Sequence, residues 1–292
     1  MKQNESFTLI EILVVIVIIG ILSAFIIVSL ANTSAKARIA KSQAFATSLK
    51  NSLLLNLVAE WKMDEGSGAT VNDKWGTYNG TLTNGDWKSG AECISGSCLY
   101  FSGDDYIIVS GLGFSLPNYV EKYGMSLTAW IKTSSAAAQS VVSQDSNSGC
   151  TYSCAGGLYI MSNKATAIVY DGAAYQYIYS TSIANDNNWH YLVASFNNDH
   201  KVRIYFDGKE ENSQTLTDYA NYNPVGITIG YLKEGSKNYN NVIGYLDEVR
   251  VFNEAVSETR VRSDYYAHLN ELLVKKAIIF DDYLSRILEL KT

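Results

Sequence analysis

One uninterrupted apolar run near the N-terminus limits what this chain can fold into. Residues Phe7 to Leu30 read FTLIEILVVIVIIGILSAFIIVSL, with Glu11 as the one ionisable side chain. As a helix with a rise of 1.5 Å per residue, the run would reach about 36 Å, enough to span a hydrocarbon core of roughly 30 Å. A secretory signal peptide has a shorter apolar region, of about 7–15 residues. The run therefore predicts a membrane-inserting helix.

The carboxylate of Glu11 needs a reason to lie inside this run. An ionisable side chain in a membrane span costs a few kcal/mol and is by default a functional hypothesis with a partner to name. Neither a signal peptide nor a plain single-span anchor explains it. A buried charge is tolerated when it is paired, and one polar contact in an apolar bundle can fix the register of the helices.

The leader MKQNES, followed by FTLIE and an apolar helix, resembles the prepilin signature of type IV pilins and type II secretion pseudopilins. The resemblance implies that a prepilin peptidase cuts between Ser6 and Phe7 on the cytoplasmic side and methylates the new amine. It also implies that Glu11 pairs with the N-terminal amine of a neighbouring subunit. The family prefers Gly before the cut and often has Pro where this chain has Val28.

The segment after the apolar run carries basic residues and a helical pattern. Lys36, Arg38 and Lys41 follow it, so the positive-inside rule alone does not favour a cytoplasmic N-terminus, whereas the pilin resemblance implies one. Apolar and small residues then recur at spacings of three and four, as in an amphipathic helix, at Ala35, Ile39, Ser42, Ala46, Leu49 and Leu53. This stripe fits either a helix resting on its own domain or a helix in a filament core.

From about Leu57 the segments become short, alternating and punctuated by Gly and Asn, which predicts antiparallel strands without intervening helices. The chain has 21 Tyr, 21 Gly and 2 Pro, which suits pleated strands and turns. The strands are expected at Leu57–Met63, Leu99–Phe101, Tyr106–Val109, Met125–Lys132, Ser140–Ser143, Gly157–Met161, Ala167–Asp171, Ala174–Ser180, His190–Asn197, Lys201–Phe206, Gly226–Tyr231 and Gly244–Phe252. Asp207-Gly208 predicts a hairpin turn.

Several stretches in this order resemble the LamG-like family of concanavalin-type jelly rolls. They are VAEWKMDEGSG, YNGTL, CLYFSGDDYIIV, MSLTAWIK, WHYLVASF, VRIYFDGK and IGYLDEVRVFNEAVS. The fold class expected is thus mainly β: a concanavalin-like antiparallel β-sandwich (jelly roll) with a long N-terminal pilin-type α-helix and a short C-terminal helical tail. The expected core aromatics are Trp61, Phe101, Trp130, Trp189 and Phe252.

Four cysteines form two close pairs, Cys93 with Cys98 and Cys150 with Cys154. Four cysteines allow three connectivities, and the short spacings favour two local disulfides. Zinc would require C-x2-C pairs or His partners, which these spacings do not provide. Disulfides also require export to an oxidising compartment.

The sequence offers little support for catalysis. Glucanases of the concanavalin fold use two carboxylates at alternate positions of one strand, and neither E-x-D-x-E nor E-x-D-x-x-E occurs. His190, His200 and His268 have no Ser or Cys nucleophile context, and His190 is interpreted as structural. We expect no enzymatic activity.

A structural Ca2+ site is the better hypothesis, because hard cations prefer carboxylates and loop carbonyls. The LamG-like resemblance implies ligands from the first and last strands, at Asp64 and Asp247. Asn79 and Asp73 in the adjoining loop could contribute. The alternative is that these acids cap loops or pair with Arg250.

Carbohydrate would suit the fold as a ligand, and aromatic side chains stack on sugar rings. The candidates are the tyrosine clusters Tyr175, Tyr177, Tyr179 and Tyr219, Tyr222. The alternative is that they are ordinary strand-surface tyrosines, since a fold alone does not define a ligand.

We expect a leader at residues 1–6, a transmembrane or filament helix at 7–56, a LamG-like β-sandwich at 57–257 and a helical tail at 258–292. The expected function is that of a pilin-like or pseudopilin subunit that displays a recognition domain. Its partners would be other pilin subunits, the prepilin peptidase, the membrane and a glycan or cell-surface ligand. The alternative is a membrane-tethered carbohydrate-binding adhesin that does not polymerise. We expect a single-pass membrane protein that moves into an extracellular filament, with the sandwich extracytoplasmic. The net charge of −6 disfavours nucleic acid.

Overall fold

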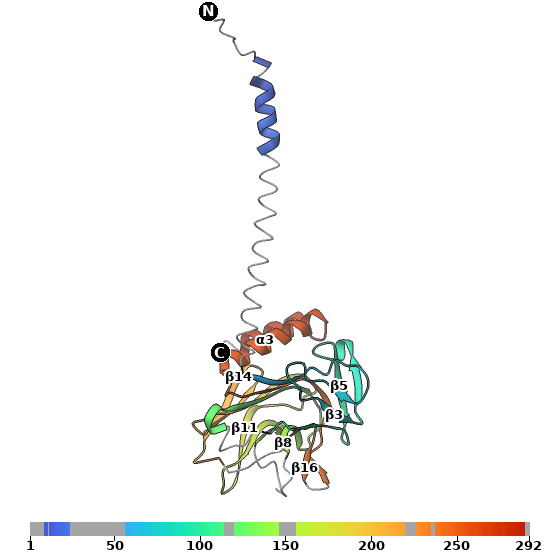
Figure 1. The fold of residues 1–292 in the computed structure, drawn as a ribbon, viewed down its shortest axis with the longest axis vertical. Helices are drawn as coiled ribbons and strands as arrows, with labels where there is room; N and C mark the ends of the chain where they lie inside the picture. The colour runs from blue at the N-terminus through green and yellow to red at the C-terminus, as the bar shows by residue number, and fades with distance from the viewer. Residues whose placement is uncertain are drawn as a thin grey trace, which may run out of the picture. The chain divides into compact units, whose positions relative to one another are not determined.

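The computed structural model describes residues 9–10, 12–23, 56–113, 120–145, 156–219, 226–234 and 237–289. The chain forms two compact units, Met1–Leu55 and Asn56–Thr292. In the first unit, residues 9–10 and 12–23 are helical, within the helix predicted from the apolar run (Figure 1). Within the described ranges, no helix is both long and apolar enough to cross a membrane. Ser6, Phe7 and Glu11 lie outside the described residues.

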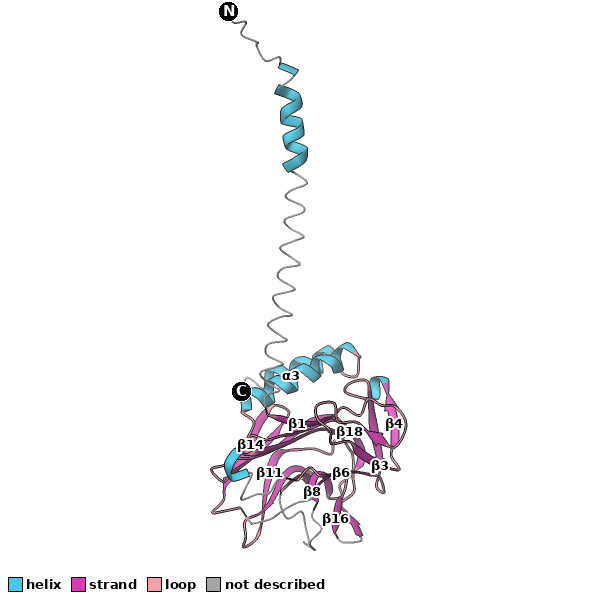
Figure 2. Ribbon diagram, viewed as in Figure 1, coloured by secondary structure: helices cyan, strands magenta, loops and turns pink. Residues whose placement is uncertain are grey.

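The second unit is a sandwich of two antiparallel sheets (Figure 2). Sheet A has the strand order β14 (Lys209–Thr215), β13 (Lys201–Phe206), β12 (Trp189–Phe196), β7 (Met125–Lys132), β18 (Ile243–Phe252), β5 (Ser97–Ser102) and β4 (Asp86–Ser89). β1 (Leu57–Trp61) also pairs with β18. The first and last strands of the sandwich are therefore neighbours.

Sheet B has the strand order β11 (Tyr175–Ile183), β10 (Lys164–Tyr170), β9 (Gly157–Met161), β8 (Gln139–Asp145), β15 (Gly226–Ile229), β6 (Tyr106–Ser110), β3 (Gly80–Thr83) and β2 (Thr70–Val71). The hairpin β16 (Leu232–Glu234) and β17 (Lys237–Tyr239) and the short helical turns η1 (Gly90–Glu92) and α2 (Glu121–Tyr123) complete the described part of the sandwich. Each of the twelve predicted strands has a counterpart, and the predicted mainly-β fold class is confirmed.

The core lies between the two sheets and follows from the alternation of side chains along each strand. On β7, Met125, Leu127, Ala129 and Ile131 point into the core cluster. The strand β14, KEENSQT, was not predicted, because an edge strand with few buried side chains lacks this apolar signal. The hairpin turn before it was predicted: Asp207 and Gly208 have φ of 48° and 89°, as a type I′ turn requires.

A C-terminal helix, α3 (Glu258–Val274), covers the outer face of sheet A (Figure 2). Ser257 caps its N-terminus, accepting a hydrogen bond from the Arg260 N–H. The Tyr265 ring stacks on Trp130 with centroids 5.5 Å apart and an interplanar angle of 13°. Trp130 is therefore buried as predicted, but it faces α3 rather than the space between the sheets.

A buried ion cluster fixes α3 to the sheet. The Arg250 Nε lies 2.7 Å from Glu60 Oε1 on β1, and its Nη2 lies 2.7 Å from Glu248 Oε2 on β18. His268 of α3 brings its Nε2 to 3.5 Å from the same Glu248 oxygen. Burial raises the pKa of Glu248, but the charges of Arg250 and His268 outweigh it and lower the pKa to about 2. Glu248 and Arg250 thus stay charged, and the cluster joins three elements.

The second C-terminal helix, α4 (Phe280–Glu289), follows residues 275–279, and both helices confirm the predicted tail. Its docked side carries Arg286, whose Nη1 donates to the Trp189 carbonyl at 2.9 Å. Tyr283 donates its hydroxyl to Asn270 on α3 at 2.7 Å. Its other side leaves Phe280, Leu284 and Leu288 exposed.

His190 lies in a buried charge clamp at the start of β12. Its Nδ1 is 2.9 Å from Asp207 Oδ2 in the β13–β14 turn, and its Nε2 is 2.9 Å from Asp186 Oδ1. Burial lowers the pKa of His190, but Asp207 and Asp186 together raise it to about 9. The hydrogen bond from His190 lowers the pKa of Asp186. His190 is thus a satisfied structural histidine, as predicted.

We expect the His190 clamp to make stability depend on pH. Because its folded pKa lies above the ordinary 6.5, its contribution is fully present below pH 6.5 and is lost as the pH rises through about 9. One proton changes the free energy of unfolding by at most about 1.4 kcal/mol per pH unit.

Urea unfolding of the 56–292 unit between pH 6.5 and 9.5 measures this slope. The His190→Gln variant should have a flatter profile in that window, whereas His200→Gln should keep the wild-type slope. Equal slopes for wild type and His190→Gln would contradict the clamp.

Candidate functional site

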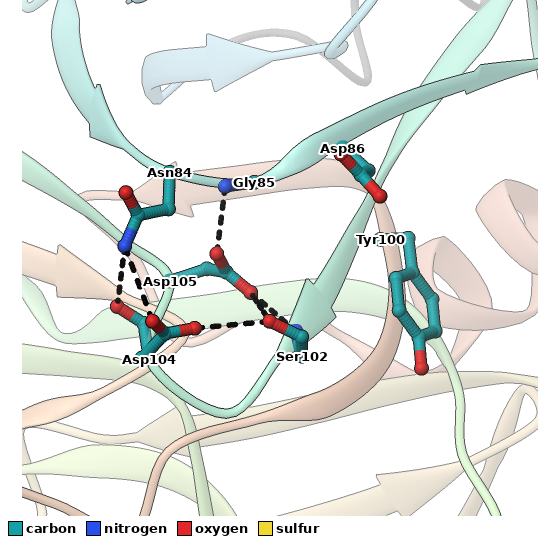
Figure 3. Close-up of a pocket in the computed structure, with 7 residues that line it drawn as sticks. All are labelled: Asn84, Gly85, Asp86, Tyr100, Ser102, Asp104 and Asp105. Carbon is teal, nitrogen blue, oxygen red and sulfur yellow. Dashed lines mark hydrogen bonds between the residues drawn. The ribbon is translucent and has the colours of Figure 1, made fainter.

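A polar hollow of ≈ 410 Å³ opens at the β4 edge of sheet A. Its lining comes from Asn84, Gly85, Asp86, Tyr100, Ser102, Asp104 and Asp105 (Figure 3). Asn84 and Gly85 form the connection from β3 to β4, and Asp104 and Asp105 belong to the connection from β5 to β6. Asp86 begins β4, and Tyr100 and Ser102 lie on β5. The pocket therefore lies where the chain crosses twice from one sheet to the other.

The local sequence explains both connections. Asn84 and Gly85 have φ of 55° and 74°, which fits an Asn-Gly turn with two left-handed residues. Gly103, with φ of 110°, lets the chain turn sharply between β5 and β6. The two turns lie side by side because Asp105 links them (Figure 3).

Asp105 is the structural carboxylate of the pocket, and only 3% of it is exposed. Its Oδ1 accepts a hydrogen bond from the Gly85 N–H at 2.7 Å, and its Oδ2 accepts bonds from the Ser102 N–H and hydroxyl. Both oxygens of Asp105 thus accept bonds from the two turns, so Asp105 holds the pocket in shape.

Asp104 is the exposed carboxylate of the same turn. The Ser102 hydroxyl lies 3.0 Å from Asp104 Oδ1 and shares its single proton between Asp104 and Asp105. The Asn84 side-chain amide donates to Asp104 Oδ2 and to the Asp104 main-chain carbonyl, each at 3.4 Å. These longer contacts leave acceptor capacity that a ligand could use.

Tyr100 forms an aromatic wall at the other end of the lining (Figure 3). Its half-buried ring meets the edge of Tyr245 with centroids 5.0 Å apart. The ammonium of Lys88 lies 5.9 Å from the Tyr100 centroid and 3.8 Å from Asp86 Oδ2. One aromatic face, several oxygen acceptors and an amide are the groups that orient a polyhydroxylated ligand.

The structure brings two of the four predicted calcium ligands to one loop. Cys93 and Cys98 form a disulfide with a Cα–Cα distance of 5.4 Å, which confirms that pair. Inside this loop, the N–H groups of Ile94 and Ser95 donate to Asp247 Oδ2 at 2.9 and 3.1 Å. The Ser97 N–H donates to Asp64 Oδ1 at 2.9 Å. Cys150 and Cys154 lie outside the described residues.

Asp247 is fully buried in this arrangement. Burial raises its pKa well above the ordinary value, and the charges of Glu248 and Asp64 act in the same direction. Asp64 and Asp247 are therefore close enough to repel each other. Two adjacent carboxylates of this kind suit a hard cation.

Asp73 and Asn79 have other partners. Asp73 accepts hydrogen bonds from the main-chain N–H groups of Glu60, Trp75 and Tyr78, and Asn79 accepts one from the Asp73 N–H. They organise the loop after β2. Among the residues that the structure describes, no group of three or more His, Cys, Asp or Glu side chains could hold a metal ion.

The tyrosine candidates separate into different settings. Tyr177 and Tyr179 on β11 are half-buried and nearly parallel, with centroids 6.3 Å apart. Tyr219 is only 2% exposed, and its hydroxyl donates to the Asn197 carbonyl, so it is a core residue and not a stacking surface. Tyr222 lies outside the described residues. Sequence reasoning missed the pocket, although its Asn-Gly and Ser-Gly-Asp-Asp turns were visible signals.

The comparisons with known proteins agree with this architecture. The profile of the concanavalin A-like lectin/glucanases superfamily matches residues 101–262. The prokaryotic N-terminal methylation motif matches residues 1–27. No curated protein matches the chain.

Solved structures of toxin binding domains share the fold. The binding domain of Paraclostridial Mosquitocidal Protein 1 has a TM-score of 0.59 at 14% identity, over 75% of this chain and 53% of that one. The botulinum neurotoxin serotype D binding domain has a TM-score of 0.54 at 17% identity, over 73% and 52%. The binding domain of Botulinum Neurotoxin DC, in complex with SialylT, has a TM-score of 0.55 at 15% identity, over 74% and 52%.

The matched region thus spans about half the length of these solved structures. At such identities the likeness concerns the fold alone. The superfamily profile, in contrast, covers more than half of this chain, and it lies on the sandwich whose two sheets are described above. The chain belongs to the concanavalin A-like lectin/glucanases superfamily.

Proposed function

We propose that the chain is a type IV pilin-like subunit that displays a glycan-binding sandwich. One observation carries the proposal: all described residues of the N-terminal helix, 9–10 and 12–23, are exposed, and all but Gly20 and Ser23 are large and apolar. A helix that is apolar on every side requires lipid or other apolar helices around it. The methylation motif at residues 1–27 supports the view that the helix is surrounded first by lipid and then by the helices of other pilin subunits.

The proposed path follows from the motif. The peptidase cuts between Ser6 and Phe7, the helix rests in the membrane, and subunits then move into an extracellular filament. Glu11 pairs with the new amine of a neighbour and sets the register, because an unpaired carboxylate in that apolar setting is costly. A membrane-tethered adhesin that never polymerises remains the second candidate, and filaments distinguish the two.

The proposed ligand of the sandwich is a glycan held in the β4-edge pocket. Tyr100 provides the ring face, Asp104 and Asn84 provide hydrogen bonds, and Asp105 holds the two turns together. Binding, rather than catalysis, is the activity proposed.

We also propose a structural Ca2+ held by Asp64 and Asp247. Asp64 lies in the segment that follows β1, and Asp247 lies on β18. The two strands pair with each other. The ion would neutralise their mutual repulsion and tie the disulfide loop to the first and last strands. Asp73 and Asn79 are not among the proposed ligands, because Asp73 bonds the N–H groups of Glu60, Trp75 and Tyr78, and Asn79 bonds the Asp73 N–H.

Glu11→Gln should abolish filament assembly while leaving membrane insertion and cleavage intact. Electron microscopy of the producing cells, with mass spectrometry of the mature N-terminus, provides the measurement. Glu5→Gln is the matched control, since the leader is removed. Normal filaments from Glu11→Gln, or an intact Met1–Ser6 leader in assembled wild type, would refute this role.

Tyr100→Ala should weaken glycan binding by roughly twofold to tenfold, because a stacked ring contributes about 0.5–1.5 kcal/mol. Asp104→Asn should weaken it by a similar factor. Titration of the purified chain with glycans selected on an array measures both. Tyr266→Ala, on α3, is the control. Unchanged affinity in both pocket variants would place the glycan site elsewhere.

Chelation should lower the melting temperature of the 56–292 unit by several degrees. A ligand at a hundredfold excess over Kd adds about 2.7 kcal/mol, and 1 kcal/mol corresponds to roughly 2–4 °C at this size. Asp247→Asn should remove most of the difference between calcium and chelator. Asp73→Asn should lower the melting temperature equally in both, because it breaks a loop. A wild-type melting temperature indifferent to chelator would eliminate the ion.

A further inference from the structure

The lining of the pocket has a one-sided charge. Three of its seven residues, Asp86, Asp104 and Asp105, are carboxylates, and none is basic. The chain as a whole has a net charge of −6, so its long-range field has the same sign. A carboxylate on a ligand would therefore be repelled at the pocket, whereas an ammonium would be attracted.

An ammonium of the chain itself already lies at the rim. The Lys88 Nζ is 3.8 Å from Asp86 Oδ2 and 5.9 Å from the centre of the Tyr100 ring. A cation within about 6 Å of an aromatic face is attracted by the ring. The Tyr100 ring and the Asp86 carboxylate thus hold a positive group together. That group, the Lys88 ammonium, partly occupies both partners.

The two exposed carboxylates, Asp86 and Asp104, can accept hydrogen bonds in addition to the contact that Lys88 makes. Asp104 is exposed, and its contacts with Asn84 are 3.4 Å long. Asp86 is also exposed, and Lys88 is its one ionic partner among the described residues. Asp105, in contrast, is buried, and both of its oxygens accept hydrogen bonds from the two turns. Two carboxylates therefore face a ligand while the third supports them.

We propose that the pocket selects amino sugars, which carry a free ammonium group, and rejects sugars that carry carboxylates. This rests on the proposed glycan recognition at the same pocket and adds its specificity. The Tyr100 face takes the sugar ring, Asp104 and Asp86 accept hydrogen bonds from the ammonium and hydroxyl groups, and Lys88 competes with the ligand for Asp86 and the ring.

Calorimetric titration of the full-length chain in detergent tests the proposal with three probes of equal length. They are oligomers of glucosamine, of N-acetylglucosamine and of galacturonic acid. The glucosamine oligomer should bind about tenfold more tightly than its acetylated form, because its ammonium groups can pair with Asp86 and Asp104. The galacturonic acid oligomer should bind most weakly. Raising the salt concentration should reduce these differences.

Two variants of the full-length chain give effects of opposite sign. Lys88→Met removes the competing ammonium and should increase the affinity for the glucosamine oligomer roughly twofold to fivefold. Asp104→Asn should decrease it by a similar factor. Lys209→Met, on β14 at the opposite edge of sheet A, is the matched control and should change nothing.

The outcomes separate the specificity from the function on which it rests. If the acetylated or acidic oligomer binds as tightly as the amine, or if Lys88→Met weakens binding of the amine, the specificity is wrong while glycan binding stands. If none of the three probes nor any glycan on an array binds the wild-type chain, glycan recognition itself fails.

Discussion

The ion cluster around Arg250 is the interaction on which the arrangement of the sandwich unit depends. It joins β1, where the sandwich begins, to β18, the strand that pairs with β1, β5 and β7, and to α3, which follows the last strand. Removing one partner of a buried ion pair leaves an unpaired charge, which typically costs about 3–5 kcal/mol. The same charges contribute much less than that relative to an apolar replacement, so the cluster specifies where α3 docks more than it adds net stability. Trp130, Tyr191 and Tyr265 then fill the space around it with stacked rings.

The sandwich was predictable where burial imposes a pattern. Strands such as β7 and β13 have one face in the core, so their alternation gave their boundaries, and Trp61 and Phe101 lie between the sheets as expected. Two of the strands that sequence reasoning missed, β4 and β14, lie at sheet edges and bury little. Trp130, Trp189 and Phe252 are buried, but on the outer face of sheet A. Their burial followed from their size, whereas the covering by α3 depends on contacts between residues more than 130 positions apart, such as Trp130 and Tyr265.

The pocket was hidden for a related reason. The sequence indicates a turn at Asn84 and Gly85 and another at Ser102 to Asp105. Whether the two turns lie close together depends on which connections pass from one sheet to the other. The bonds from the Gly85 N–H to Asp105 and from the Asn84 side-chain amide to Asp104 show that the two turns form one site. The acids that the sequence did single out separate in the same way. Asp64 and Asp247 meet at one loop because β1 pairs with β18. Asp73 instead accepts hydrogen bonds from two N–H groups of its own loop, those of Trp75 and Tyr78, and from the Glu60 N–H on β1.

The disulfide loop shows how two like charges are kept together. Three N–H groups, from Ile94, Ser95 and Ser97, donate to Asp247 and Asp64. The bonds from Ile94 and Ser95 oppose the rise in the pKa of Asp247 that burial and the neighbouring charges cause. An unconstrained loop would have to order itself to present those donors. Closing six residues with a disulfide removes about 2 kcal/mol of loop entropy from the unfolded state on the chain-entropy estimate. The Cys93–Cys98 bond therefore preorganises the donors, and the carboxylates retain their positions next to the strand pair β1–β18 whether or not an ion joins them.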